Sequence, residues 1–279
     1  MKHITLLFLL LMLTSCEEEV IVFNIENLNR DNITVLGHGG MGIASSYPMN
    51  SYESIMNCIN LGTDGTEIDV QMTKDGVLVV FHDSELSSKT DLKGVVNSMT
   101  WEELKNAHYD EMPYATYSLV SLDQIFANIN DVSSFRFTFD CKLYREEAID
   151  EAYLNQFAEA IVSIVEKYDL QRRIYIESND KEFLQTLQIK RRWYRLFIYP
   201  QTFEEGLATA KELNLYGITI STNDINSEQV QIAHEDGLRI AVWNTHSEQD
   251  NMEAVQKNPD FIQTDNVKYL VNLLSASEN

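Results

Sequence analysis

Residues 65–83 read Gly-Thr-Glu-Ile-Asp-Val-Gln-Met-Thr-Lys-Asp-Gly-Val-Leu-Val-Val-Phe-His-Asp, and this stretch decides the fold. β-rich runs lie on both sides of Lys74-Asp75-Gly76. An Asp-Gly step between such runs is a hairpin signal. We therefore expect a strand at 65–72 that continues into a small hairpin, which brings His82 and Asp83 back toward the end of the strand.

The same alternation of β-rich runs and helical patterns continues on both sides of this stretch. We expect strands at 33–37, 65–72, 135–143, 173–177, 194–199, 216–221, 238–244 and 260–264. We expect helices near 51–61, 121–130, 147–168, 181–191, 203–213, 227–236, 248–257 and 267–274. Strands that alternate with helices imply an α/β fold with a parallel sheet. Eight such units favour a single closed (β/α)8 TIM barrel over residues 31–279, with a doubly wound open sheet as the alternative.

The charge balance limits the classes of ligand. The 279 residues include 21 Lys and Arg against 43 Asp and Glu, which gives a formal net charge of −22. General nucleic-acid binding is disfavoured, because it needs clustered cationic side chains that displace phosphate counterions. An anionic ligand would need a local device against the overall repulsion, and a bound cation is one such device.

The N-terminus has the architecture of a signal peptide. A short basic start precedes an apolar run at 4–13, which is too short to span a bilayer as a free helix. The run ends in Leu13-Thr14-Ser15-Cys16, which resembles a bacterial lipoprotein signal. This resemblance implies a signal peptide at 1–15, a lipidated Cys16, a tether at 16–30 and lipid anchoring at the bacterial cell envelope, in the outer membrane and either periplasmic or surface-exposed. An ordinary cleaved signal peptide is the alternative.

Glu67 and Asp69 are the first candidates for chemistry. Side chains two positions apart on a strand point to the same face, so the two carboxylates point together. They would repel each other at the end of a barrel strand unless something neutralises them. A hard divalent cation such as Ca²⁺ or Mg²⁺ does so with oxygen ligands. A salt-bridged or solvated carboxylate pair is the alternative.

The strand at 135–143 separates apolar from polar side chains in the same way. One face carries Phe135, Phe137, Phe139 and Cys141, and the other carries Arg136, Thr138, Asp140 and Lys142. A polar inward face is costly unless it serves a site. Asp140 is therefore a candidate third carboxylate for the cation, and Lys142 a candidate group for an anion. An internal ion pair between these two side chains is the alternative.

Two histidines follow expected strand ends. His38 lies in Gly37-His38-Gly39-Gly40 after the first strand, and His82 follows the hairpin. In a barrel both loops open on the same face, where two imidazoles beside a cation form a candidate general acid–base pair. A metal ligand or a hydrogen-bonded structural residue is the alternative for each. His108, His234 and His246 have no comparable context.

The ordered motifs resemble the glycerophosphodiester phosphodiesterase family over roughly residues 32–275. The matching segments are His38-Gly39-Gly40, Asn50-Ser51, Glu67-Ile68-Asp69-Val70, Thr73-Lys74-Asp75-Gly76, His82-Asp83, Gly94, Trp101-Glu102-Glu103-Leu104, Ser121-Leu122, Val242-Trp243 and Thr264-Asp265. The resemblance implies a (β/α)8 barrel that hydrolyses a small phosphodiester, with a divalent cation, to an alcohol and glycerol phosphate. The family route uses the adjacent glycerol hydroxyl as nucleophile and passes through a cyclic phosphate.

The resemblance also implies roles for individual residues. Glu67 and Asp69 match the metal ligands, and Asp140 takes the third ligand position, where the family usually has Glu. His38 and His82 match the catalytic histidines. Lys142 matches the phosphate-binding lysine, and Trp243 is expected to form an apolar wall of the pocket.

Two departures from the family pattern bear on the substrate. Gly39 replaces the Arg of the His-Arg-Gly motif, and Met49 replaces the Glu of the Pro-Glu-Asn-Thr motif. If that Arg and Glu pair in relatives, the loss of both avoids leaving one buried charge unpaired. We expect an active but substrate-shifted enzyme. The alternatives are a phosphodiesterase for another lipid or envelope phosphodiester, and a surface lipoprotein that binds a ligand without turnover.

Overall fold

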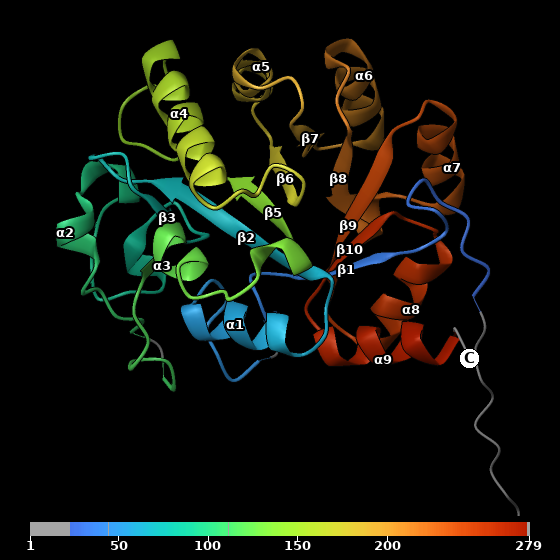
Figure 1. The fold of residues 1–279 in the computed structure, drawn as a ribbon, viewed down its shortest axis with the longest axis horizontal. Coiled ribbons are helices and arrows are strands. Elements are labelled where there is room, and N and C mark those ends of the chain that lie inside the picture. The colour runs from blue at the N-terminus through green and yellow to red at the C-terminus, as the bar shows by residue number, and fades with distance from the viewer. Residues whose placement is uncertain (1–22, 44, 111, 278–279) are drawn as a thin grey trace, which may run out of the picture.

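A computed structural model of the chain describes residues 23–43, 45–110 and 112–277, and eight parallel strands in it close into a barrel (Figure 1). These strands are β1 (Thr34–Gly37), β2 (Gly65–Met72), β5 (Arg136–Cys141), β6 (Ile174–Ser178), β7 (Arg195–Ile198), β8 (Gly217–Ser221), β9 (Arg239–Thr245) and β10 (Phe261–Thr264). The first strand pairs with both β2 and β10, which closes the sheet. The predicted TIM barrel is confirmed, and the open sheet is excluded.

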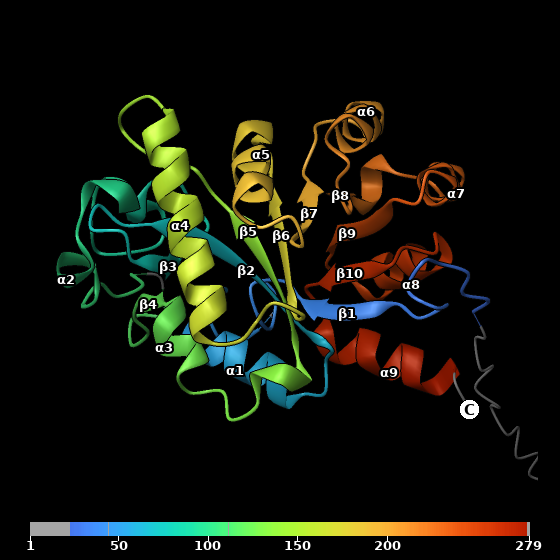
Figure 2. The ribbon, with the colours of Figure 1, turned by 45° about the horizontal axis from the view of Figure 1, so that its top comes forward.

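Helices surround the strands on the outside of the barrel (Figure 2). Those that follow barrel strands are α1 (Tyr52–Asn60), α4 (Glu151–Lys167), α5 (Lys181–Lys190), α6 (Phe203–Leu213), α7 (Ser227–Glu235), α8 (Glu248–Gln256) and α9 (Val267–Ser277). Short polar side chains accept hydrogen bonds from the first helical turns, namely Ser51, Asp150, Asp180, Thr202, Asn226 and Ser247. Such caps satisfy backbone N–H groups that have no partner inside the helix. The helix expected from residue 147 therefore begins only after its cap, Asp150.

The predicted hairpin is confirmed. Strand β3 (Leu78–Val80) pairs antiparallel with β2, with Val70 opposite Val80, and Gly76 supplies the positive φ of the turn, 83°. A short strand that was not expected, β4 (Val120–Ser121), pairs with β3. The connection to β5 also contains α2 (Trp101–Leu104) and α3 (Leu122–Phe126), the latter within the helix expected at 121–130. Around the hairpin, residues 84–110 and 112–119 form a side lobe with its own apolar cluster, at the left in Figure 1.

The interior of the barrel changes from apolar to polar along the strands. Near the amino-terminal end, the ring of Phe261 lies 4.8 Å from that of Tyr175 and 5.6 Å from that of Phe197. Two residues further along β6 and β10, the inward side chains are Glu177 and Gln263, which hydrogen-bond to each other at 3.0 Å. The aromatic layer therefore closes one end of the barrel, and polar groups gather at the carboxyl end.

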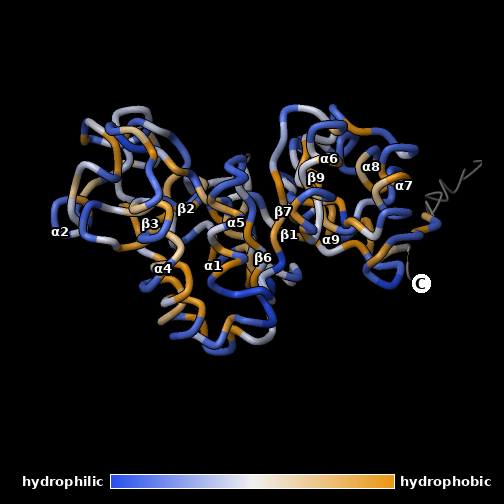
Figure 3. Tube along the Cα trace, turned by 90° about the horizontal axis from the view of Figure 1, so that it is seen from above, coloured by the Kyte–Doolittle hydropathy of each residue, from blue (hydrophilic) through white to orange (hydrophobic). Residues whose placement is uncertain are grey.

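The outer face of β5 packs against helices, as the alternation at 135–143 predicted. Phe137 and Phe139 are buried, and their ring centroids lie 5.0 and 5.9 Å from that of Phe126 in α3. In Figure 3, hydrophobic colour lies on strands such as β7, and hydrophilic colour lies in many of the outer loops.

The described part of the predicted tether at 16–30 is attached to the barrel. The backbone N–H of Leu28 donates to Asp260 Oδ1 at 2.9 Å, and Asn27 Nδ2 donates to the carbonyl oxygen of Pro259 at 2.9 Å. Phe23 and Ile25 pack against the main core. The predicted signal peptide and Cys16 lie outside the described residues. Within residues 23–277 as described, no helix has the length and apolar character that a membrane span requires.

Phe126 joins α3 to the outer face of β5, so its removal tests the packing of the hairpin connection against the barrel. We expect Phe126→Ala to lower the free energy of unfolding by about 3–5 kcal/mol, because it leaves a cavity among buried rings. Urea-induced unfolding followed by circular dichroism measures the change. Ile189→Ala is the control, since Ile189 is 85% exposed and its truncation should change stability by less than about 0.5 kcal/mol.

Candidate active site

The predicted site residues meet in a small pocket, lined mostly by charged and polar residues, at the carboxyl ends of the barrel strands. This inner pocket has a volume of about 80 Å³ and is lined by His38, Glu67, His82, Asp140, Lys142, Glu177, Tyr199, Thr219, Trp243 and Gln263. All the predicted catalytic, cation-binding and substrate-binding residues line it except Asp69. In TIM barrels this face carries the active site.

Strand register brings the acidic side chains together. Asp69 on β2 is aligned with Asp140 on β5, which is aligned with Glu177 on β6. Glu67 lies two residues before Asp69 and so points to the same side. Oxygen atoms of Glu67, Asp140 and Glu177 all lie within 4.8 Å of one another, and all three residues are buried.

The electrostatics of these three carboxyl groups require a countercharge. Burial, followed by the charges of Asp69 and Glu177, raises the pKa of Glu67 well above its ordinary value. Burial and then the charge of Asp140 raise the pKa of Glu177 to about 8. Burial also raises the pKa of Asp140, although Lys142 partly offsets it. Mutual repulsion therefore opposes the simultaneous ionisation of all three groups, and a cation bound beside them would relieve it.

The donor set fits a hard divalent cation. Carboxylate oxygens are the ligands that Ca²⁺ and Mg²⁺ prefer. One oxygen of Glu67, Oε2, accepts a hydrogen bond from the backbone N–H of Gly39 at 2.9 Å. The other, Oε1, is buried and has no hydrogen-bond partner among the described residues. A buried carboxylate oxygen without a partner is costly, and a cation at this point would satisfy it.

Asp69 has a different environment from the other three carboxylates. Its Oδ1 lies 3.1 Å from Lys142 Nζ, and its Oδ2 accepts a hydrogen bond from Asn50 Nδ2 at 2.6 Å. Burial alone would raise the pKa of Asp69, but Lys142 and the two site histidines lower it below its ordinary value. Protein groups therefore hold this carboxylate ionised, and its role as a cation ligand stays a prediction.

Lys142 makes the ion pair that was the alternative to an anion-binding role. Its Nζ lies 2.5 Å from Asp140 Oδ2 and 3.1 Å from Asp69 Oδ1. Burial alone would lower its pKa, but the two aspartates raise it well above the ordinary value, so the amine is protonated. The ion pair and the anion-binding role are compatible, because Lys142 also lines the inner pocket.

Each site histidine is oriented by an aspartate. His38 Nδ1 lies 3.1 Å from Asp265 Oδ1, and His82 Nδ1 lies 2.6 Å from Asp83 Oδ1. A carboxylate at Nδ1 favours the proton there and leaves Nε2 for a ligand. Burial alone would lower the pKa of His38, but the hydrogen bond and charge of Asp265 outweigh this and raise it. The sequence had predicted both histidines but neither orienting contact.

Three site residues were missed by sequence reasoning. Glu177 was one of them. It is the one charged residue of the strand Ile174–Ser178 and lies near its end, which is a pattern that could have indicated a site residue. Asp265 was noted only as part of a motif. His246, which had no context in the sequence, lies with Nδ1 2.5 Å from Asp265 Oδ2. The buried carboxylate of Asp265 thus lies between His38 and His246.

The two positions that depart from the family pattern are in contact. A Cβ atom at Gly39, whose φ is 53°, would lie 2.9 Å from Met49 Cε and 3.0 Å from Met49 Cβ. This adjacency agrees with the hypothesis that an Arg and a Glu at these positions are exchanged as a pair. Trp243 lines the inner pocket as expected, with its ring 5.8 Å from that of Tyr199.

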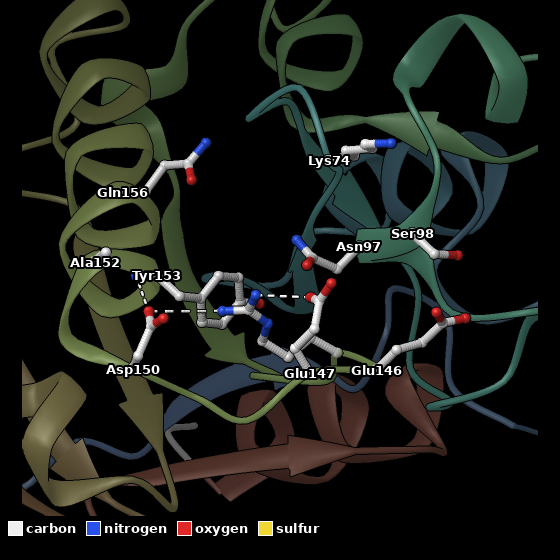
Figure 4. Close-up of a pocket in the computed structure, with 10 residues that line it drawn as sticks. Lys74, Asn97, Ser98, Glu146, Glu147, Asp150, Ala152, Tyr153 and Gln156 are labelled. Carbon is white, nitrogen blue, oxygen red and sulfur yellow. Dashed lines mark hydrogen bonds and ion pairs between the residues drawn. The ribbon is translucent and has the colours of Figure 1, made fainter.

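A separate cavity of about 370 Å³ lies between Lys74 in the hairpin, Asn97 and Ser98 in the side lobe, and the start of α4 (Figure 4). Its Arg145 lies 2.7 Å from Glu147 and 3.7 Å from Asp150, so acidic neighbours already neutralise the cation. None of the predicted site residues lines this cavity.

Known proteins that are similar in sequence to this chain include glycerophosphodiester phosphodiesterases. A glycerophosphodiester phosphodiesterase from Bacillus altitudinis is 32% identical over 144 residues, which are 49% of this chain and 55% of that protein. One from Caldanaerobacter subterraneus subsp. tengcongensis is 25% identical over 240 residues, which are 84% of this chain and 95% of that protein.

Solved structures show the same fold. The structure of a phosphodiesterase from Oleispira antarctica, in complex with the product sn-glycerol-3-phosphate, matches this chain with a TM-score of 0.76 at 18% identity. The match covers 87% of this chain and 96% of that one.

The model of the glycerophosphoryl diester phosphodiesterase family matches residues 41–269, which include every residue of the inner pocket except His38. The members of this family are phosphoric diester hydrolases. With a barrel, a pocket and a sequence match of this extent, the chain belongs to the glycerophosphoryl diester phosphodiesterase family.

Proposed function

We propose that the protein hydrolyses a glycerophosphodiester to an alcohol and glycerol phosphate. The observation that carries the proposal is one pocket in which two aspartate-oriented histidines and a protonated lysine lie beside a buried carboxylate cluster. Family membership supports the reaction class. The product complex of the Oleispira antarctica protein supports a small phosphate ester as the ligand.

Glu67 and Asp140 belong both to the predicted cation ligands and to the carboxylate cluster, so they are proposed as the principal ligands of a divalent cation, Ca²⁺ or Mg²⁺. Asp69 is proposed as a further ligand, and Glu177 adds a buried carboxylate beside them. When bound, the cation would act as a Lewis acid that stabilises charge on the phosphate and lowers the pKa of a coordinated hydroxyl.

The chain's own groups then bind the phosphate and move the protons. Lys142 supplies a fixed positive charge in a largely desolvated pocket, where electrostatic attraction is strong. The two Nε2 atoms share the proton transfers. In the first step one takes the proton of the attacking glycerol hydroxyl as its bond to phosphorus forms, and the other gives a proton to the alcohol as its bond to phosphorus breaks. Water then opens the cyclic phosphate to glycerol phosphate, with the two imidazoles in exchanged roles. A protein that only bound its ligand would not need both imidazoles held in this way.

We also propose that Cys16 is lipidated and anchors the protein at the bacterial cell envelope. The support is the lipoprotein-like order Leu13-Thr14-Ser15-Cys16 after an apolar run. An envelope location would bring lipid-derived phosphodiesters near the barrel.

The function is tested by the release of glycerol phosphate from glycerophosphocholine and related diesters. We expect cation-dependent release by the unaltered protein, and a loss of at least about 100-fold in kcat for His38→Ala and for His82→Ala, since each removes a proton-transfer group. His108→Ala is the matched control, because His108 does not line the inner pocket. Near-normal turnover by either site variant would remove that histidine from the mechanism.

The cation site is tested by calorimetric titration of the chelator-treated protein with Ca²⁺ and Mg²⁺. We expect Glu67→Gln to weaken the binding of the preferred ion by at least about tenfold, because it removes charge at a buried oxygen that has no other partner. Glu102→Gln, at an exposed position, is the control and should bind as the unaltered protein does. The same titration of Asp69→Asn and of Glu177→Gln shows which of these two carboxylates contributes to the affinity for the cation. Unchanged affinity in Glu67→Gln would contradict the site.

The contact between Asp265 and His38 predicts a shift in the pH profile. The carboxylate stabilises the imidazolium and so raises the pKa of His38. We therefore expect Asp265→Asn to reduce kcat/KM by about 100-fold and to move the limb of the pH profile that belongs to His38 to lower pH. Asp260→Asn is a matched control, since Asp260 is equally buried and lies 2.8 Å from His234 at the other end of the barrel. It should reduce stability without moving the profile, and the same shift in both variants would refute the assignment.

A further inference from the structure

A larger, mainly apolar cavity adjoins the inner pocket, and His38 and His82 line both. This outer pocket has a volume of about 500 Å³, against about 80 Å³ for the inner one. Its apolar and aromatic lining comes from Ile43, Tyr47, Met49, Phe81, Tyr109 and Tyr114. A part of a substrate that does not fit beside the carboxylates can therefore extend past the two histidines into this space.

The walls of the outer pocket are held in place from both sides. Tyr109 in the side lobe donates its hydroxyl to the carbonyl oxygen of Met49 at 3.2 Å, and Tyr114 donates to that of Ser45 at 3.1 Å. Both hydroxyl groups thus have backbone partners, which leaves the ring surfaces to line the cavity. These contacts tie the β1–α1 loop to the side lobe, so the pocket is preformed.

The charged groups that line this pocket have opposite signs. Burial alone would raise the pKa of Asp83, but the hydrogen bond from His82 lowers it, with a smaller electrostatic contribution from Lys89. Nothing in this pair selects a strongly charged substituent. Size and lining are those of a site for an organic group of moderate size.

Met49 makes the wall beside His38 apolar. Its side chain lies over Gly39, where a side chain on residue 39 would otherwise project. Ile43 lines the same pocket and is 63% exposed, so it marks the point where the apolar lining reaches the surface. The apolar surface thus runs from the histidines to the solvent.

We propose that the substrate is a glycerophosphodiester that carries an alkyl or acyl chain, and that this chain lies in the outer pocket. The inference rests on the proposed function and specifies its substrate class. Each methylene group that the pocket removes from water strengthens binding by roughly fourfold. A short chain should therefore produce a measurable preference.

The test compares kcat/KM for three soluble diesters: glycerophosphocholine, 1-hexanoyl-glycerophosphocholine and the hexyl ester of glycerol phosphate, all below their micellar concentrations. We expect at least one chain-bearing diester to exceed glycerophosphocholine by tenfold or more. The two chain positions show whether the chain belongs to the glycerol or to the leaving alcohol. Hydrolysis of glycerophosphocholine without a preference for either chain would overturn the inference and leave the function standing. No hydrolysis of any diester by the cation-loaded protein would overturn both.

Variants of the outer-pocket wall test whether the preference for a chain-bearing diester arises in this pocket. Met49→Glu places a charge in the apolar wall and should reduce the ratio of kcat/KM between the preferred chain-bearing diester and glycerophosphocholine by at least tenfold. Met49→Leu keeps the apolar volume and should retain the ratio. Ile43→Glu, at an exposed position, provides a second test that does not depend on the folding of Met49→Glu. Ile189→Glu is the remote surface control. An unchanged ratio in both charged variants would overturn the assignment of this pocket.

Discussion

Mutual repulsion among buried carboxylates is the constraint on which the rest of the site depends. The parallel register aligns Asp69, Asp140 and Glu177 across three neighbouring strands, and Glu67 lies beside them. Four acidic groups at one barrel mouth are unstable as four anions. Lys142 forms ion pairs with Asp69 and Asp140, and Asn50 donates a hydrogen bond to Asp69, so the pKa of Asp69 is lowered while those of Glu67, Asp140 and Glu177 stay raised. The cluster is therefore suited to bind a cation.

This constraint also explains how a strongly acidic protein can bind an anion. With a formal net charge of −22, the protein repels a phosphodiester at long range. Within the pocket, a divalent cation, Lys142 and a protonated histidine would reverse the sign of the local potential. The aromatic layer beneath the carboxylates excludes water from one side, which strengthens these interactions.

The fold was predictable because local patterns and topology agree. The structure contains the three features that these patterns predicted: eight alternating strand–helix units, the Asp-Gly hairpin and a strand at 135–143 with one apolar and one polar face. The two-residue strand β4 was missed because nothing in two residues separates a strand from a loop; it exists only through its pairing with β3. Residues 23–30 were predicted to be part of a tether. Their attachment to the barrel could not be predicted, because it depends on contacts with Asp260 and Pro259, which lie more than 200 residues away.

Within the site, the sequence identified residues by their place at strand ends and could not identify contacts between distant segments. His38, His82 and Lys142 were found in this way, and all line the inner pocket. The role of Asp265 could not be derived, because its partners His38, Ile43 and His246 come from opposite ends of the chain.

Met49 and Gly39 illustrate how a departure from a motif acquires physical meaning. Taken one at a time in the sequence, the loss of an Arg and the loss of a Glu both suggest weakened function. In three dimensions the two positions touch, so a paired exchange leaves neither charge buried alone. In this chain Met49 lies against Gly39 and leaves an apolar surface beside His38. The proposed catalytic groups follow strand ends, whereas most of the proposed substrate-binding wall lies on the β1–α1 loop and the side lobe, so the wall can change while the groups of the inner pocket stay in place.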